Sequence, residues 1–196
     1  MLLVLVCAGF SSPLIFKGLL EGETSALAVE LKPRFWVAID VHRGGLLKMW
    51  RGSLESSRDG AGKAVLRSRG KALLEALPKE SIWAIRHGGG EKLSPRILGL
   101  AAREGELSLL YEAHRKKPKF RIHELIKTRS VGAEVVGIDR IIETSNIPKE
   151  WTLYFICPPG DWQLWHAFWE DYTESLHLVG LWTNQRARAR FTFANL

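Results

Sequence analysis

The sequence predicts an all-β chain, folded as an antiparallel β-sandwich with at most one or two short helices. Two observations lead to this prediction. Short segments rich in branched and aromatic residues recur along the chain, and residues that favour turns separate them. Segments in which apolar residues have helical spacing are few. Many short strands with few helices between them are typical of a sandwich or a barrel.

The strand-like segments are spread over the whole length of the chain. We expect strands at residues 13–20, 25–31, 35–40, 46–52, 82–86, 96–100, 107–111, 120–127, 135–144, 151–156 and 186–193. The pair Gly44-Gly45 has the composition of a hairpin turn, with Trp36 and Trp50 on its two arms.

Three segments depart from this pattern. Residues 53–64 are rich in Ser, Gly, Asp and Lys, which predicts a surface loop. Residues 65–77 place their apolar side chains near helical spacing and predict a short helix, which Gly70 weakens. Residues 161–172 fit a helical stripe and strand alternation equally well, so both readings stay open.

We expect one β-sandwich domain over residues 13–196, preceded by an apolar segment over residues 1–12. The stretch from Met1 to Gly9 resembles the apolar core of a secretory signal, but it lacks a basic leader and is too short to span a bilayer. A clipped signal and a first strand both fit. Cys7 and Cys157 are too few for a zinc site and form no C-x-x-C-H pair; two buried thiols and a disulfide remain the alternatives.

The composition favours a binding role. Eight tryptophans among 196 residues are more than usual, and tryptophan is rarely buried in full, so some of them are expected at a surface. The net charge of +7 attracts acidic partners, although it carries no information about the fold.

No motif in the sequence predicts a catalytic centre, a metal or a cofactor. The run His87-Gly-Gly-Gly90 is similar to an esterase oxyanion loop, but no G-x-S-x-G motif accompanies it, which favours a turn. Asp40 and His42 have i, i+2 spacing but are only two ligands, so a hairpin end is the better reading. A glycosidase acid and base could come from carboxylates whose separation the sequence does not show: Glu112, Glu124, Asp139 and Glu143.

Aromatic and basic residues are the candidates for partner binding. The aromatic candidates are Trp162, Trp165 and Trp169. The basic candidates are Arg115, Lys116, Lys117, Arg186, Arg188 and Arg190. The first three basic residues lie in a charged run that reads as a turn rather than a nucleic-acid site, and the last three alternate on one strand face. Together they predict a patch that attracts an acidic protein, with no nucleic-acid partner.

Three stretches carry a resemblance to a known family. They are Pro13-Leu-Ile-Phe-Lys17, Phe35-Trp-Val-Ala-Ile-Asp40 and Gly45-Leu-Leu-Lys-Met-Trp-Arg-Gly52. They resemble the opening of a β-rich domain found beside c-type cytochrome modules in bacterial membrane-associated and periplasmic proteins, which reads roughly "W-V-A-Y-D … L-Y-K-x-W-x-G". Residues 82–86, 95–100 and 105–112 are similar to later strands of that family in the same order. No C-x-x-C-H follows, and the Ser/Gly-rich residues 53–69 replace the usual connection.

The resemblance implies the scaffold of this family without its redox centre. It implies a non-catalytic accessory subunit at the periplasmic or extracytoplasmic face of a bacterial membrane. Such a subunit docks on a cytochrome-bearing electron-transfer assembly, either a respiratory complex or a photosynthetic reaction centre. At the face of a membrane it can also contact the membrane surface. The alternative is a carbohydrate-binding module that stacks sugars on exposed tryptophans. A third hypothesis is an enzyme that uses carboxylates in a cleft.

Overall fold

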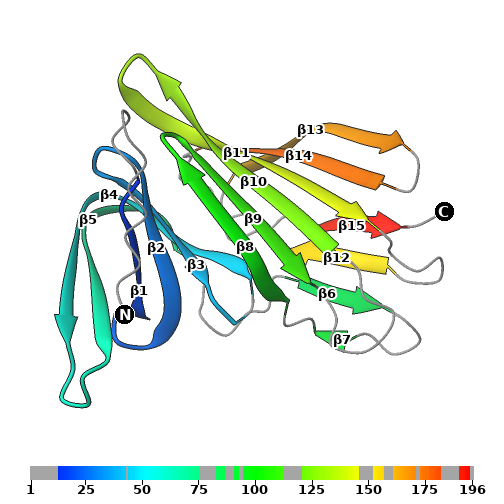
Figure 1. Ribbon diagram of the computed structural model, residues 1–196. Coiled ribbons are helices and arrows are strands. Elements are labelled where there is room, and N and C mark those ends of the chain that lie inside the picture. The colour runs from blue at the N-terminus through cyan, green and yellow to red at the C-terminus, as the bar shows by residue number, and fades with distance from the viewer. Residues whose placement is uncertain are drawn as a thin grey trace.

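The fold is known from a computed structural model. It describes residues 13–42, 44–75, 83–86, 91–92, 95–112, 121–145, 152–156, 161–170, 173–181 and 190–194, and their side chains over 13–42, 44–75, 95–112, 121–135 and 137–143. These residues form fifteen strands in three sheets and contain no helix (Figure 1). The predicted all-β, mainly antiparallel, sandwich-like fold is confirmed.

The first five strands form a closed barrel. They are β1 (Ile15–Leu20), β2 (Thr24–Lys32), β3 (Phe35–Asp40), β4 (Gly45–Arg58) and β5 (Ala64–Glu75). Each pairs with the next in antiparallel order. A short parallel pairing of Leu19 and Leu20 with Val65 and Leu66 joins β1 to β5 and closes the barrel.

Two further sheets contain the remaining strands. The six-stranded sheet is antiparallel, in the order β13 (Asp161–Glu170), β14 (Thr173–Leu181), β11 (Glu134–Ser145), β10 (Arg121–Val131), β9 (Glu106–Glu112) and β8 (Arg96–Arg103). The four-stranded sheet has the order β15 (Arg190–Ala194), β12 (Thr152–Ile156), β6 (Trp83–Arg86) and β7 (Glu91–Lys92). In Figure 1 the blue and teal barrel lies beside the green strands of the six-stranded sheet.

Two apolar clusters form the core of the described part. One fills the barrel and consists of Leu20, Ala26, Ala28, Trp36, Ala38, Leu47, Trp50 and Leu66. The other lies between the outer wall of the barrel and the six-stranded sheet. It combines barrel residues such as Val29, Val37 and Met49 with sheet residues such as Leu109 and Ile126. The barrel and the sheet therefore share one core.

Strand β3 is buried on both of its faces. Phe35, Val37 and Ile39 pack in the shared core, whereas Trp36 and Ala38 alternate with them and pack inside the barrel. Side chains of successive strand residues point to opposite faces, so a strand enclosed on both sides has no polar face. This explains why the sequence Phe-Trp-Val-Ala-Ile is apolar without interruption.

Polar contacts also join the barrel to the six-stranded sheet. The N–H of Gly105, in the turn between β8 and β9, donates to the carbonyl of Leu31 in β2 at 2.5 Å. Arg51 of β4 donates to the carbonyl of Val135 at 2.9 Å and pairs with Glu134 at the same distance. Both contacts lie at the rim of the shared core and fix the sheet against the barrel wall.

A glycine pair bends the hairpin of β4 and β5. Gly52 and Gly70 are direct partners in the ladder, and their φ values of 149° and 124° favour glycine. A Cβ on Gly52 would lie 1.8 Å from the carbonyl oxygen of Arg69, and a Cβ on Gly70 would lie 2.1 Å from that of Arg51. This close backbone approach lets both long strands contribute to the barrel wall.

The structure corrects two predictions in this hairpin. Residues 65–77 were expected to form a helix, but β5 covers Ala64–Glu75 and pairs with β4 throughout. A register irregularity between Met49 and Trp50 skips Leu73, so the adjacent apolar residues Leu73 and Leu74 fit a strand whose alternation is interrupted there. Residues 53–64 were expected to form a loop, but β4 extends to Arg58. The turn is confined to residues 59–63, where Asp59 accepts backbone N–H groups of Ala61 and Lys63.

Other sequence predictions have mixed outcomes. The hairpin at Gly44-Gly45 is confirmed, with Trp36 directly opposite Trp50. Residues 161–170 form strand β13, so the helical alternative is wrong there. Residues 1–12, both cysteines and the run His87–Gly90 lie outside the described residues.

Substitution of Gly52 by alanine is expected to destabilise the protein by about 3 kcal/mol or more, because the added methyl group meets a backbone carbonyl in a strained conformation. The free energy of unfolding, from urea titration followed by tryptophan fluorescence, measures this. Gly60→Ala is the control, since no atom lies within 4 Å of its added Cβ, and it should change stability by less than about 0.5 kcal/mol. Equal stability of both variants would contradict the close backbone approach at the Gly52–Gly70 bend.

Candidate functional site

The core face of the six-stranded sheet contains a buried polar triad of Tyr111, Glu124 and Arg140, each fully buried. They come from β9, β10 and β11. The Tyr111 hydroxyl donates to Glu124 Oε2 at 3.1 Å. Arg140 Nε donates to Glu124 Oε1 at 2.7 Å, and Nη2 of the same guanidinium also contacts that oxygen. Because buried charge is costly unless paired, these contacts make the triad compatible with the surrounding apolar core.

The triad is a structural element rather than an open site. Burial raises the pKa of the Tyr111 hydroxyl well above its usual value, and the Glu124 carboxylate raises it further, so the hydroxyl stays protonated and donates. The ring of Tyr111 also contacts the β3–β4 turn. A Cβ on Gly44, which has a φ of 62°, would lie 2.8 Å from this ring. The triad thus lies where the barrel meets the sheet.

The opposite face of the same sheet carries a second polar chain. Ser108 Oγ lies 2.9 Å from His123 Nε2, and His123 Nδ1 lies 3.0 Å from Glu143 Oε2. Ser108 is in β9, His123 in β10 and Glu143 in β11, so three adjacent strands supply one residue each. The side chains of His123 and Glu143 are 42% and 48% exposed. This chain faces solvent.

The four carboxylates considered for a glycosidase do not share one site. Glu124 lies on the core face, whereas Asp139 and Glu143 lie on the opposite face according to the strand register. Glu124 contacts Arg140, Asp139 contacts Arg129 at 2.9 Å and Glu143 contacts His123. Three of the four are therefore engaged with basic side chains.

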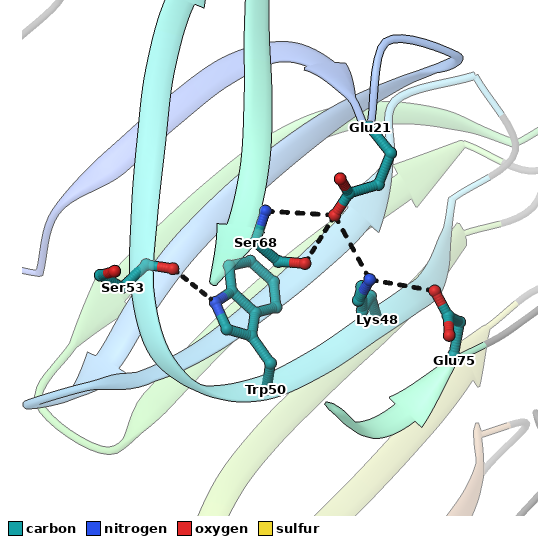
Figure 2. Close-up of polar contacts among 6 residues, drawn as sticks. All are labelled: Glu21, Lys48, Trp50, Ser53, Ser68 and Glu75. Carbon is teal, nitrogen blue, oxygen red and sulfur yellow. Dashed lines mark hydrogen bonds and ion pairs between the residues drawn. The ribbon is translucent and has the colours of Figure 1, made fainter. Parts of the chain in front are cut away.

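A charged cluster joins β4 and β5 to the turn between β1 and β2 (Figure 2). Lys48 Nζ lies between two carboxylates, 3.3 Å from Glu21 and 3.0 Å from Glu75. Glu21 also accepts hydrogen bonds from the backbone N–H and the hydroxyl of Ser68. Nearby, Trp50 Nε1 donates to the carbonyl of Ser53 at 3.0 Å. The cluster ties the turn to both long strands.

The pKa values in this cluster favour the charged forms. Partial burial acts to raise the pKa of Glu21, but the Ser68 hydrogen bonds and Lys48 outweigh it and lower that pKa. Partial burial acts to lower the pKa of Lys48, but Glu75 and Glu21 outweigh it and raise that pKa. Both groups are therefore charged at neutral pH and support a structural role.

Strand β5 carries a row of cations on its outer face. We call Arg67, Arg69 and Lys71, together with Lys63 in the turn just before the strand, the β5 basic row; all four are exposed. Arg67, Arg69 and Lys71 alternate with Leu66, which packs inside the barrel, so these three side chains point away from it. Arg69 pairs with Glu55 at 2.9 Å, while Arg67 and Lys71 make no ion pair with a described residue. This row is therefore a basic surface in which Glu55 neutralises only Arg69 among the residues that the structure describes.

The structure places only some of the predicted partner-binding residues. Trp162, Trp165 and Trp169 lie in β13, where Trp162 pairs with Gly180 and Trp169 with Glu174. Arg190 pairs with Ile156 at the end of β12. The backbone of these residues is described, but their side chains are not. Outside the described residues lie Arg115, Lys116, Lys117, Arg186 and Arg188.

Two of the tryptophans that could have been exposed are buried. Trp36 and Trp50 stack inside the barrel with ring centroids 5.9 Å apart and planes 10° apart. They stabilise the barrel and offer no platform for a sugar. Asp40 Oδ1 accepts the backbone N–H of His42 at 2.7 Å, which confirms that this pair forms a hairpin end.

The comparisons with known proteins assign no family. No family model matches the chain, and no curated protein matches it. In the described ranges, no cluster of three or more His, Cys, Asp or Glu is arranged to hold a metal ion, and no helix is long and apolar enough to cross a membrane. The resemblance to the cytochrome-linked domain therefore stays a prediction.

Substitution of Arg140 by methionine should destabilise the protein by about 3–5 kcal/mol, because it leaves the Glu124 carboxylate buried without its cation. Chemical denaturation measures the loss. A triple variant with Tyr111→Phe, Glu124→Leu and Arg140→Met removes all three polar groups together and should recover most of the stability. If the triple variant is as unstable as Arg140→Met, the triad is not a mutually satisfied unit.

Proposed function

We propose that the chain is an accessory subunit that docks on an acidic face of a protein in a membrane electron-transfer assembly. The observation that carries this proposal is the β5 basic row. Three of its four exposed cations lie on one strand and the fourth, Lys63, lies in the turn before it; the described residues supply a single carboxylate, Glu55, in an ion pair with the row. A protein with complementary acidic residues is the partner that such a surface fits.

The geometry of the row suits recognition of a protein surface. Alternate residues of a strand lie about 7 Å apart, so Arg67 and Arg69 present neighbouring charges, and Lys71 follows them beyond the bend at Gly70. The strand beneath them is held by its ladder with β4 and by the bend at Gly52 and Gly70. Fixed charges lose less conformational freedom on binding than charges on a loop, which favours specific docking.

The cytochrome context rests on the resemblance of this chain to a domain found beside c-type cytochrome modules, which is carried by residues 13–17, 35–40 and 45–52 and by the later segments 82–86, 95–100 and 105–112. The stretches within residues 13–52 lie in β1, β3 and the first half of β4 and in the residues just before β1, and the last of them ends at Gly52, where the hairpin bends. The signature Phe-Trp-Val-Ala-Ile-Asp is the doubly buried strand β3. The residues that carry the resemblance thus include buried scaffold residues. The β5 basic row is not among them, so it supports the docking proposal separately.

Reversal of two charges in the row tests this function. The tagged full-length chain is mixed with detergent-solubilised native membranes, and c-type haem in the captured material is measured by its absorbance. The wild type should retain a haem protein at low salt, and the Arg67→Glu, Lys71→Glu variant should retain on the order of ten-fold less. Raising the ionic strength to about 0.15 M or above should weaken wild-type capture, because screening acts on exposed charges.

The matched control carries the same charge change on the six-stranded sheet. Arg96 and Arg121 are exposed there, and the Arg96→Glu, Arg121→Glu variant should capture as much haem protein as the wild type. Absence of haem protein in the wild-type sample would overturn the cytochrome partner. Equal loss in both variants would show that net charge, and not the β5 basic row, governs binding.

A further inference from the structure

We infer that Ser108 is a nucleophile, activated by His123 and oriented through Glu143, on the exposed face of the six-stranded sheet. The chemical class it fits is small activated acyl compounds, such as aryl esters. This inference is independent of docking, because the β5 basic row lies on the barrel and these three residues lie on β9, β10 and β11.

The two hydrogen bonds assign a role to each ring nitrogen of His123. A carboxylate only accepts hydrogen bonds, so Nδ1 carries the ring proton and donates it in a hydrogen bond to Glu143 Oε2 at 3.0 Å. Nε2 is then the unprotonated nitrogen that accepts from the Ser108 hydroxyl at 2.9 Å. This order of hydroxyl, imidazole and carboxylate is the arrangement in which histidine removes a proton from an attacking serine.

The sheet holds these groups in place. Leu110 is directly opposite His123 on one side, and Glu143 is directly opposite it on the other. The reverse face of the same three strands packs into the shared core through Leu109, Ile122 and Ile142. Side chains on such a rigid support keep their relative geometry, which a catalytic arrangement requires.

The reaction follows from these roles. Ser108 Oγ attacks the acyl carbon while its proton moves to His123 Nε2, and a bond forms between Oγ and that carbon. The carbon–oxygen bond to the leaving group then breaks, and the leaving alkoxide or phenoxide takes the proton from Nε2. Water repeats the sequence on the acyl-serine and releases the acid.

The exposed position determines the substrate class. Because His123 and Glu143 face solvent, a substrate gains little binding energy from enclosing walls, and reactivity depends on a good leaving group. Glu143 is a positioning residue here, since it acts on the acyl compound only through His123.

Covalent labelling of the full-length chain tests the inference. The native protein is treated with a fluorophosphonate and, separately, with p-nitrophenyl acetate, and peptide mass spectrometry gives the labelling rate at each serine. Ser57 is the internal control, because it is exposed and forms no side-chain hydrogen bond with a described residue. Ser108 should be labelled on the order of 100-fold faster than Ser57, the acceleration that a positioned general base supplies.

Variants separate the roles of the three residues. His123→Gln should lower the Ser108 rate on the order of 100-fold, and Ser108→Ala should remove the label from this peptide. Glu143→Gln should lower the rate by about ten-fold or more, whereas Glu143→Asp should restore part of it, which loss of sheet stability alone would not do. Equal labelling of Ser108 and Ser57 in the native wild type would overturn the inference, whatever the variants do.

Discussion

Strand β3 is the constraint on which the rest of the structure depends. Its six residues are all buried because one face lines the barrel and the other lies in the core shared with the six-stranded sheet. Full burial of a Val, Ile or Phe side chain contributes about 1.5–3 kcal/mol, whereas an exposed ion pair such as Lys32–Glu104 contributes about 0–1 kcal/mol. Apolar burial across β3 therefore holds the barrel and the sheet together, and polar contacts at the rim orient them.

Local sequence patterns predicted most strands because alternation and turn residues act over short distances. The prediction failed at β5, where the adjacent residues Leu73 and Leu74 do not alternate because a register irregularity skips Leu73. It failed again at residues 53–58, where strand pairing with β5 outweighed a loop-like composition. Closure of the barrel was also beyond sequence reasoning, since the parallel pairing of β1 with β5 joins residues 46 positions apart in the sequence, and no local pattern encodes such a contact.

The two faces of the six-stranded sheet show what register adds to sequence. Strands at 107–111, 120–127 and 135–144 were expected, but Ser108, His123 and Glu143 meet only when all three are aligned. A shift of one residue would place His123 in the core and Glu124 in solvent. The buried ion pair of Glu124 with Arg140 opposes such a slip, so the same pair that stabilises the core also positions the exposed serine chain. Alternation within each strand could be read from the sequence and shows which residues share a face. The pairing between strands, which brings the three residues together, could not be read from it.

Native-state hydrogen exchange tests the shared core most directly. If β3 joins the barrel and the six-stranded sheet, amides of β3 and of β9 to β11 exchange with one free energy of opening, equal to that of global unfolding. Val37→Ala, which truncates a residue of the shared core, should lower that free energy equally in both groups, by about 1–3 kcal/mol. Two distinct opening free energies, with the variant affecting the barrel amides alone, would contradict a common core.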